Sequence, residues 1–553
     1  MLKEKQEIRV LKYKKYKISA FIICSLLFFG AIKKDVYRQV RDNQNLLNDV
    51  YRQLIMNYVD DIDIEAFTKL SINNMLSDLD PYTVFMEKEE KSGIEMLTRG
   101  KYGGVGIVIG KREKRLTVIT PMEDSPAKNA GIISGDKIFY IDSVDTKDLT
   151  MDDAAKLIRG KKGSKVTLGI KRFDEEDLIY FTLNREEIKV KDVSYAGMLD
   201  SSTGYIRLNR FSKNCDIEVR NALEKLMKEN MSGLIFDLRD NPGGLLNAAV
   251  NILDLFIPKG QLLVWTEGKT KKSTREYKSR NNPIIPEDLN ITILVNRGSA
   301  SASEIIAGTM QDLDRAVVIG RSTFGKGLVQ TVVNIDKDRA LKLTTAKYYI
   351  PSGRLIQKPG YLPRDILADT SKIDTIFYTK GGRTVSGGGG ITPDYKIKLD
   401  SPSPILSAGW RQGLFFNFVQ KKKNKYNNFM EVVNDDSLMV NFEKYIESSD
   451  IEVFMKGESS YLDMKELLFN LDSNSVQITG AIDILDSYFE QKALNQFSFE
   501  KEKLKHWLLV EFSDYFDGEG GRVKQASKED KDILKALEIL SDPVAYNRVF
   551  SLQ

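Results

Sequence analysis

The sequence predicts an α/β multidomain protein, with a small strand-rich domain before the α/β core and a helical extension after it. The chain has 553 residues, well above the roughly 100 to 200 residues of one domain, so three or four units are expected. Strands and helices alternate between Gly204 and Asp400, as in an α/β core. Residues 401–553 are largely helical and contain no motif that indicates a role.

Composition and charge exclude several classes of protein. A hydrophobic fraction of 42% with 29% charged residues is ordinary for a globular chain and argues against disorder. The net charge of +4 is concentrated in the first 17 residues, so no basic surface for nucleic acid is expected. One histidine, His506, and two cysteines, Cys24 and Cys215, cannot build a usual zinc site or a histidine-based triad near a candidate nucleophile.

Residues 1–34 have the layout of a secretory signal or a short membrane anchor. Ile18 to Ile32 is a run of 15 apolar or small residues behind a lysine-rich segment. As a helix it spans about 22 Å, less than the roughly 30 Å of a bilayer core, although flanking lysines extend its reach. We expect export to the periplasm, with anchoring in the inner membrane if the segment is retained. A lipid on Cys24 is disfavoured by the bulky Ile23 before it.

Two further units are predicted before the core. Residues 35–97 have helical periodicity, broken by a turn at Leu79 to Thr83. Residues 98–185 are rich in strands and have the size of a small independent domain. The strands are predicted at Val105 to Ile109, Leu116 to Thr120, Lys137 to Ile141 and Lys165 to Lys171, with a helix at Met151 to Ile158.

The core is predicted at residues 186–400. Its strands are expected at Tyr205 to Asn209, Gly233 to Leu238, Ile291 to Val295 and Ala316 to Gly320. Its helices are expected at Ile217 to Met227, Leu245 to Phe256 and Ile305 to Leu313. Three of the strands lead directly into segments that carry candidate chemistry.

A serine cluster stands where one strand meets a helix. The strand Ile291 to Val295 leads into Ser299 to Glu304, followed by an apolar helix. A serine at a helix start stands where unpaired main-chain N–H groups can stabilise a developing oxyanion. Small neighbours let a substrate backbone approach closely. The alternative is simple capping of the helix by Ser303 with Glu304.

A lysine between two glycines follows the next strand. Lys326, in Gly325-Lys326-Gly327, can approach another loop closely, and in a dry setting its pKa falls so that the neutral amine can accept a serine proton. The alternative is a solvated lysine. Gly320 to Lys326 also matches a phosphate-binding loop, but Gly327 replaces the required Ser or Thr and a strand follows where a helix is needed, so nucleotide binding is disfavoured.

A third segment, Arg239 to Gly244, also lies between a buried strand and an apolar helix. Its glycine N–H groups could supply a second oxyanion donor, or the segment could be a plain turn.

Taken together, these motifs resemble the carboxy-terminal processing (tail-specific) peptidases, the S41 family of serine proteases. The resemblance covers roughly Tyr51 to Asp394. It includes Leu79-Asp80-Pro81-Tyr82, Tyr102-Gly103-Gly104-Val105-Gly106, Gly204-Tyr205-Ile206-Arg207, Arg239 to Gly244, Ser299 to Glu304, Thr323 to Gln330, Gly389-Gly390-Ile391 and Pro393-Asp394. It implies a PDZ domain at residues 98–185, inserted before a core at 186–400 related to the ClpP and crotonase folds. Residues 401–553 match no shared part.

The resemblance also implies roles for individual residues. Ser301 corresponds to the nucleophile, Lys326 to the general base and Gln330 to the residue that orients the lysine amine. The oxyanion hole corresponds to the N–H of Ala302 and of Gly243 or Gly244. Asp312 matches an acidic position that some members need, for structure rather than for proton transfer.

Substrate choice is expected to lie in the PDZ domain. The glycines of Tyr102-Gly103-Gly104-Val105-Gly106 free successive N–H groups to bind a terminal carboxylate, and the strand after them can pair with an extended peptide. Leu157 and Ile158 are candidates for the side-chain pocket. The alternative is a glycine-rich hairpin without a ligand.

The function predicted is a Ser/Lys endopeptidase that cleaves exported proteins near their C-termini, without a metal, nucleotide or other cofactor. Its partners are protein or peptide tails with a free carboxylate, and a homo-oligomer is allowed. Two alternatives stay open: a non-catalytic PDZ adaptor or chaperone, and acyl-CoA chemistry on a crotonase-like fold.

Overall fold

The computed structural model describes residues 36–112, 115–172, 175–361, 376–449, 451–472 and 475–551. The chain divides into two compact units, Met1–Leu79 and Asp80–Gln553. The predicted signal or anchor at residues 1–34, including Ile18 to Ile32, lies outside the described residues. Among the residues described, no helix has the length and apolar character needed to cross a bilayer.

The described part of the first unit is helical. A helix over residues 36–57 is followed by α2 (Ile64–Ser77). Asp63 caps α2 by accepting a hydrogen bond from the Ala66 N–H at 3.0 Å. Tyr51 joins the two helices, because its hydroxyl bonds Thr68 Oγ1 at 2.7 Å and its ring packs on Phe67.

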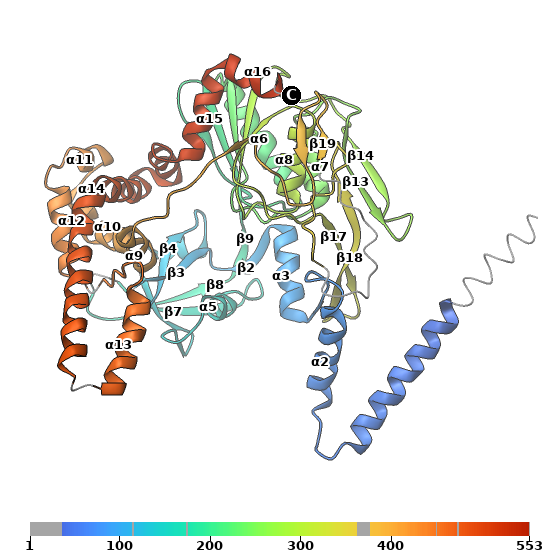
Figure 1. Cartoon of the computed structure of the whole chain (residues 1–553), viewed down its shortest axis with the longest axis horizontal. Coiled ribbons are helices and arrows are strands. Elements are labelled where there is room, and N and C mark those ends of the chain that lie inside the picture. Colours follow the sequence, from blue (N-terminus) through green and yellow to red (C-terminus); the bar gives the residue numbers. More distant parts are fainter. Residues whose placement is uncertain are drawn as a thin grey trace, which may run out of the picture. The chain divides into compact units, whose positions relative to one another are not determined.

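The second unit begins with β1 (Val84–Met86) and α3 (Lys88–Arg99), and the strand-rich domain expected to be a PDZ domain follows. Its sheet has the order β3-β4-β5-β7-β8, with β6 on β5. Figure 1 labels β3, β4, β7 and β8 of this sheet. The bounds are β3 (Ile107–Arg112), β4 (Arg115–Pro121), β5 (Lys137–Ile141), β6 (Val144–Asp145), β7 (Lys165–Lys171) and β8 (Ile179–Asn184). The short α4 (Pro126–Asn129) lies between β4 and β5, and α5 (Met151–Ile158) packs near β3 and β5. The order leaves β3 at the edge of the sheet.

A two-stranded ribbon connects the PDZ domain to the core. β2 (Lys101–Gly104) pairs antiparallel with β9 (Glu186–Lys189), so the chain leaves and re-enters the core at one place. The strand predicted from Val105 begins instead at Ile107. Gly106 before it has a φ of +73°, a left-handed conformation that favours glycine, so Val105 and Gly106 form a turn.

The core is a mixed sheet of order β10-β11-β12-β15-β16-β21, parallel except for β10. Its strands are β10 (Val193–Met198), β11 (Thr203–Leu208), β12 (Gly233–Asp237), β15 (Asn290–Val295), β16 (Val317–Gly320) and β21 (Tyr395–Lys396). On one face its apolar side chains pack with those of α6 (Cys215–Lys228), α7 (Leu246–Leu253) and α8 (Ala302–Asp312). The other face is covered by α15 (Lys531–Ser541) and α16 (Pro543–Ser551). A mainly parallel sheet needs cover on both faces, so the last two helices of the chain complete the core.

A second sheet flanks the core and was not anticipated as a unit. Its order is β1-β18-β13-β14, with β17 on β18. The bounds are β13 (Leu262–Gly268), β14 (Arg275–Lys278), β17 (Leu328–Asn334) and β18 (Ala340–Tyr349). A small hairpin, β19 (Ile376–Tyr378) with β20 (Thr384–Ser386), follows.

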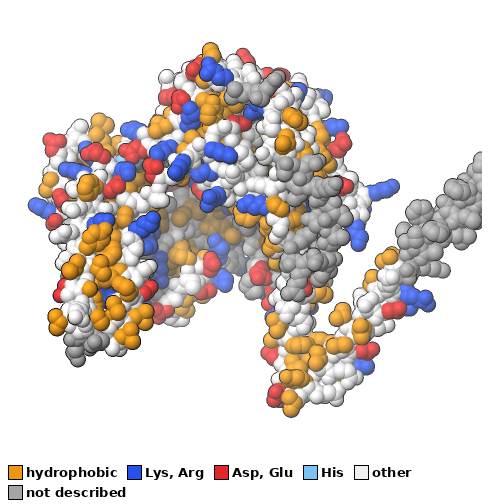
Figure 2. Space-filling model, viewed as in Figure 1, with side chains coloured by type: hydrophobic (Ala, Val, Ile, Leu, Met, Phe, Trp, Pro, Cys, Tyr) orange, Lys and Arg blue, Asp and Glu red, His pale blue; other side chains and the backbone are white. Residues whose placement is uncertain are grey.

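The C-terminal helical domain has an aromatic core of its own. Its helices are α9 (Pro404–Gln412), α10 (Leu414–Lys422), α11 (Phe429–Val433), α12 (Leu438–Glu447), α13 (Glu458–Asp472) and α14 (Val476–Ala526). Phe418 packs against both Phe442 and Phe512. Figure 2 shows apolar side chains gathered on α13 and α14, where Leu471 is 80% and Ile484 72% exposed.

Candidate active site

Three loops of the core leave the C-terminal ends of neighbouring parallel strands. The glycine loop (residues 239–244) follows β12, the serine loop (296–301) follows β15, and the lysine loop (321–327) follows β16. In open parallel sheets, ligands bind at this edge of the strands. The fold therefore brings all three predicted catalytic segments together at the C-terminal ends of the parallel strands.

Ser301 stands at the start of α8 with an unusual backbone. Its φ is +54° and its ψ is −111°, a conformation that non-glycine residues rarely adopt and that the surrounding structure must hold in place. Ser301 occupies the N-cap position and forms a capping box with Glu304. Ser303, the expected cap, instead lies within the helix, and its hydroxyl donates to the Asn241 carbonyl at 2.9 Å.

The Glu304 carboxylate holds the serine loop and the lysine loop together. One oxygen, Oε2, accepts the main-chain N–H of Ser301 at 2.8 Å and that of Lys326 at 2.9 Å. The other, Oε1, accepts the Thr323 hydroxyl at 2.5 Å and the Gly325 N–H at 2.6 Å. Glu304 is fully buried, and burial raises its pKa. The main-chain atoms of Ser301 and Lys326 thus meet on a single oxygen atom.

Lys326 lies in a setting that disfavours its charge. Burial, with repulsion from Lys342, lowers the pKa of the Lys326 amine to about 8, while Glu304 and Asp80 act in the opposite direction. Its Nζ lies 4.6 Å from the centre of the Tyr82 ring. Within the described residues, no hydrogen bond joins Nζ to Ser301 Oγ. The amine therefore loses its proton far more readily than a solvated lysine does, although most of it is still charged at pH 7, and the two side chains are not engaged.

Tyr348, a residue of β18, braces both loops from the second sheet. Its hydroxyl lies within hydrogen-bond distance of the Ser301 carbonyl, at 3.1 Å, and of the Lys326 carbonyl. The ring is only 1% exposed, and burial raises the pKa of Tyr348 well above its usual value. It therefore remains a neutral hydrogen-bond donor at any ordinary pH.

The glycine loop lies directly against Ser301. A Cβ on Gly243 would stand 2.9 Å from both the Ala302 nitrogen and the Ser301 Cβ, so only glycine allows this approach. In this state the Gly243 N–H donates to Asn241 Oδ1 at 2.9 Å. The N–H groups of Ala302 and Gly244 donate no hydrogen bond within the described residues. The Gly243 N–H would have to give up its hydrogen bond to Asn241 Oδ1 before it could donate to an oxyanion.

Gln330 and Asp312 occupy different environments. Gln330 lies at a register shift of β17, and its buried Nε2 has no partner among the described residues. Asp312 ends α8, about 16 Å along the helix from Ser301, and forms a fully buried ion pair with Arg354 at 2.7 Å. Asp312 therefore lies in a structural ion pair, away from the three loops.

The remaining candidate groups lie elsewhere. His506 is in α14, beside Glu529 at 3.7 Å, and burial lowers its pKa. Cys215 begins α6 and is buried, which raises the pKa of its thiol. Neither residue belongs to the three loops.

The structure divides the predicted carboxylate-binding segment. Tyr102 and Gly103 belong to β2 and pair with Ile188 and Glu187, and Gly104 ends that strand. Val105 and Gly106 form the turn before β3, and their N–H groups donate no main-chain hydrogen bond within the described residues. Ile158 is buried in the PDZ core, and Leu157 packs partly against that core.

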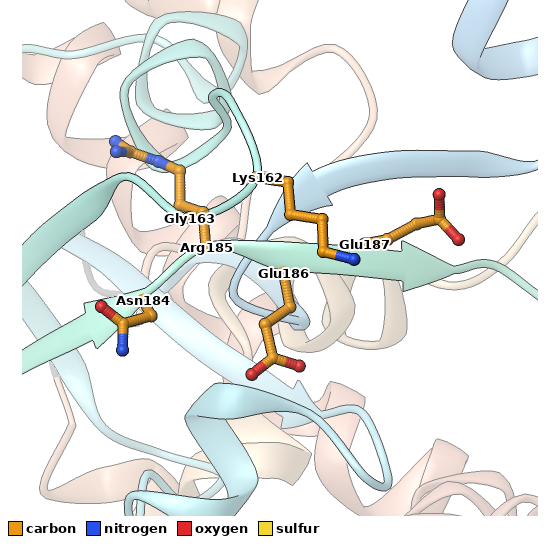
Figure 3. A pocket seen from close by; sticks show the side chains of 6 residues that line it. All are labelled: Lys162, Gly163, Asn184, Arg185, Glu186 and Glu187. Carbon is orange, nitrogen blue, oxygen red and sulfur yellow. The ribbon is translucent and has the colours of Figure 1, made fainter.

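A separate open pocket of about 620 Å³ lies on the PDZ domain, near the junction of β8 and β9 (Figure 3). It is lined by Lys162, Gly163, Asn184, Arg185, Glu186 and Glu187. Figure 3 shows Arg185 and Glu186 pointing to opposite sides of the strand. Arg185 is used internally, since its Nε and Nη2 donate to the Ile158 and Leu157 carbonyls at 2.9 and 2.7 Å and so cap α5. None of the predicted catalytic residues lines this pocket.

Comparison with known proteins decides the family. The chain is 36% identical over 325 residues to a carboxy-terminal-processing protease of Bartonella bacilliformis, covering 58% of this chain and 74% of the relative. It is 34% identical over 373 residues to a probable CtpA-like serine protease of Staphylococcus epidermidis, covering 67% and 74%. The chain belongs to the carboxy-terminal processing proteases of peptidase family S41. It is therefore a serine-type peptidase, a hydrolase.

Three segments of the chain match models of protein families that agree with this assignment. Residues 202–367 match peptidase family S41, residues 117–172 a PDZ domain, and residues 406–540 the probable PDZ-protease C-terminal helical domain. Among solved structures, the photosystem II D1 C-terminal processing protease is 27% identical, with a TM-score of 0.36, covering 64% of this chain and 93% of that one. The S41 peptidase thus carries the predicted PDZ domain and helical C-terminal domain, but the expectation that residues 401–553 match no shared part is wrong, because most of this region matches a domain of PDZ-proteases.

Sequence reasoning missed several residues of this S41 site. Glu304 was read only as a partner in capping, and Tyr348 was not considered. Tyr82, which supplies the ring beside Lys326, was named only within the turn and the family motif Leu79-Asp80-Pro81-Tyr82, without a role. The spacing from Ser301 to Glu304 signals a cap, but nothing local shows that the same carboxylate reaches the lysine loop.

Proposed function

We propose that this S41 peptidase uses Ser301 as nucleophile and Lys326 as general base to cleave exported proteins near their C-termini. The observation that carries the proposal is the shared Glu304 oxygen, which brings the main chain of both residues together. The lowered pKa of Lys326, about 8, supports the role of base.

The reaction begins when neutral Lys326 Nζ takes the Ser301 hydroxyl proton as Oγ attacks the peptide carbonyl carbon. The carbonyl oxygen becomes an oxyanion, which the N–H groups of Ala302 and of Gly243 or Gly244 stabilise. The C–N bond then breaks, and the Lys326 ammonium gives its proton to the leaving amine. Water, deprotonated by Lys326, next attacks the acyl-enzyme, and the proton returns to Ser301 Oγ. In this scheme Gln330 orients the lysine amine.

Tail capture is assigned to the PDZ domain. The edge of β3 can pair with an extended peptide, and α5 packs beside this strand. The unengaged N–H groups of Val105 and Gly106 lie at the start of this edge, where a terminal carboxylate would sit. We also propose that the core is of the ClpP and crotonase type. Residues 1–34 are proposed to direct export.

A matched pair of tail peptides tests this function. A peptide with a free C-terminal carboxylate should be cleaved with a kcat/KM about 10 to 100 times that of the same peptide ending in an amide, because hydrogen bonds to a charged group contribute about 1.5 to 3 kcal/mol. The difference should appear mainly in KM. Cleavage is followed by mass spectrometry of both products.

Acetylation of the N-terminus of the same peptide is the control and should leave kcat/KM unchanged. Equal cleavage of the acid and the amide would contradict capture by the carboxylate and assign selection to the active-site cleft. Tight binding of the tail without any cleavage would favour the non-catalytic adaptor instead.

A further inference from the structure

We propose that Asp532, in the first turn of α15, is a positioning residue of the active site. Through it, the C-terminal region holds the glycine loop and the lysine loop in the arrangement that the reaction requires. This inference rests on the proposed Ser301/Lys326 peptidase and names a positioning contact of that same site.

The Asp532 carboxylate binds the first residue of the glycine loop and the first residue of the lysine loop. Asp532 Oδ2 accepts from Arg239 Nη1 at 2.9 Å, and Oδ1 accepts from Arg321 Nη1 at 2.9 Å. Arg239 begins the glycine loop and Arg321 begins the lysine loop. Asp532 is 1% exposed, so solvent barely screens either ion pair.

The carboxylate is itself held firmly by the helix. Asp530 caps α15 by accepting the N–H groups of Asp532 at 3.0 Å and Ile533 at 3.2 Å, and it binds Arg239 Nη1 as well. Carboxylates are also favoured in the first turn of a helix by the helix dipole. Ile533, the residue after Asp532, is buried against the core sheet, which fixes this end of the helix. The position of Asp532 is therefore set by the C-terminal region and not by the loops.

The two arginines depend on Asp532 to different degrees. Arg239 has two further anchors, because Asp237 accepts from its Nε at 3.0 Å and its Nη2 at 2.7 Å, and Asp530 accepts from its Nη1 at 2.8 Å. Among the described residues, the only ion pair of Arg321 is with Asp532. Removal of the Asp532 charge should therefore loosen the lysine loop more than the glycine loop.

A displaced Arg321 is expected to displace Lys326, because the two residues are close along the chain. Arg321 lies five residues before Lys326, and the segment between them is tied to Glu304 and to Ser299, whose carbonyl accepts the Phe324 N–H at 3.0 Å. A shift of about 1 Å in a catalytic group can lower a rate by about 100-fold. The C-terminal region thus acts on kcat without contacting the substrate.

The test compares Asp532→Asn with Ile539→Ala in the full chain. Both change α15, but only the first removes the contact with the loops. Asp532→Asn should lower kcat for a tail peptide about 10- to 100-fold, with KM within twofold. Ile539→Ala should change kcat less than threefold, even where it lowers the melting temperature by the same amount as Asp532→Asn. Asp532→Glu, which keeps the charge, should recover part of the loss.

Hydrogen exchange provides a readout independent of activity. Asp532→Asn should speed amide exchange in residues 321–327 more than in 239–244, whereas Ile539→Ala should not. Arg321→Gln, at a site that is 23% exposed, should give the same pattern if Asp532→Asn does not fold. Equal kcat and equal exchange in Asp532→Asn and Ile539→Ala would overturn the inference. A wild-type enzyme without activity would instead count against the Ser301/Lys326 proposal. Hydrogen exchange would still show whether Asp532 holds the lysine loop.

Discussion

Replacement of Ser301 by Ala, or of Lys326 by Met, is expected to lower kcat/KM for a tail peptide by about 10⁴-fold, as loss of a nucleophile or its base does in other serine hydrolases. Lys326→Met removes the amine and keeps a side chain of similar length. Lys326→Arg should be equally inactive, because the guanidinium stays charged and cannot accept the hydroxyl proton. The measurement is steady-state cleavage of one peptide by the purified full-length variants.

Ser322→Ala is the matched control, since Ser322 is exposed in the same loop as Lys326, and it should retain wild-type cleavage. Binding of the tail, followed by fluorescence anisotropy, should be unchanged in Ser301→Ala. Full cleavage by Ser301→Ala or by Lys326→Arg would contradict the assigned roles.

Glu304→Gln is expected to be the most damaging substitution outside the dyad. The carboxylate accepts four hydrogen bonds, two on each oxygen. The amide of glutamine keeps one oxygen and turns an NH₂ toward two of the donors. We expect kcat/KM to fall about 10² to 10³-fold, and the free energy of unfolding to fall by about 2 to 4 kcal/mol, because buried donors lose their acceptors.

Denaturant unfolding and peptide cleavage measure the two effects of Glu304→Gln separately. The control is Thr309→Val, in the same helix as Glu304. Thr309 is fully buried and donates to the Leu263 carbonyl at 2.8 Å, away from the three loops. It should lower stability but leave kcat/KM within threefold. Near wild-type cleavage by Glu304→Gln would show that the shared carboxylate does not align the site.

Local patterns in the sequence predicted most of the elements in the PDZ domain and the core. The bounds of Lys137–Ile141, Met151–Ile158 and Lys165–Lys171 agree with prediction because side-chain periodicity and turn residues define such elements locally. The three candidate catalytic segments were also located, because each follows a buried strand. Their meeting at one edge follows from parallel strand order.

Long-range contacts explain what the sequence did not reveal. The bond between Arg239 and Asp530 joins residues 291 positions apart, and no periodicity signals it. Residues 401–553 were predicted as a separate helical region, yet α15 and α16 cover the core sheet through Ile533 and Tyr546. An amphipathic helix shows that it has a partner but does not show which one.

The pH dependence of acylation tests the central claim, that Lys326 is the base, most directly. Burst-phase acylation of Ser301 should rise about tenfold per pH unit below the amine pKa of about 8 and become constant above it, because only the neutral amine accepts the proton. The same profile should persist in His506→Gln. A rate that is constant from pH 6 to 9, or an inflection that disappears in His506→Gln, would contradict the account.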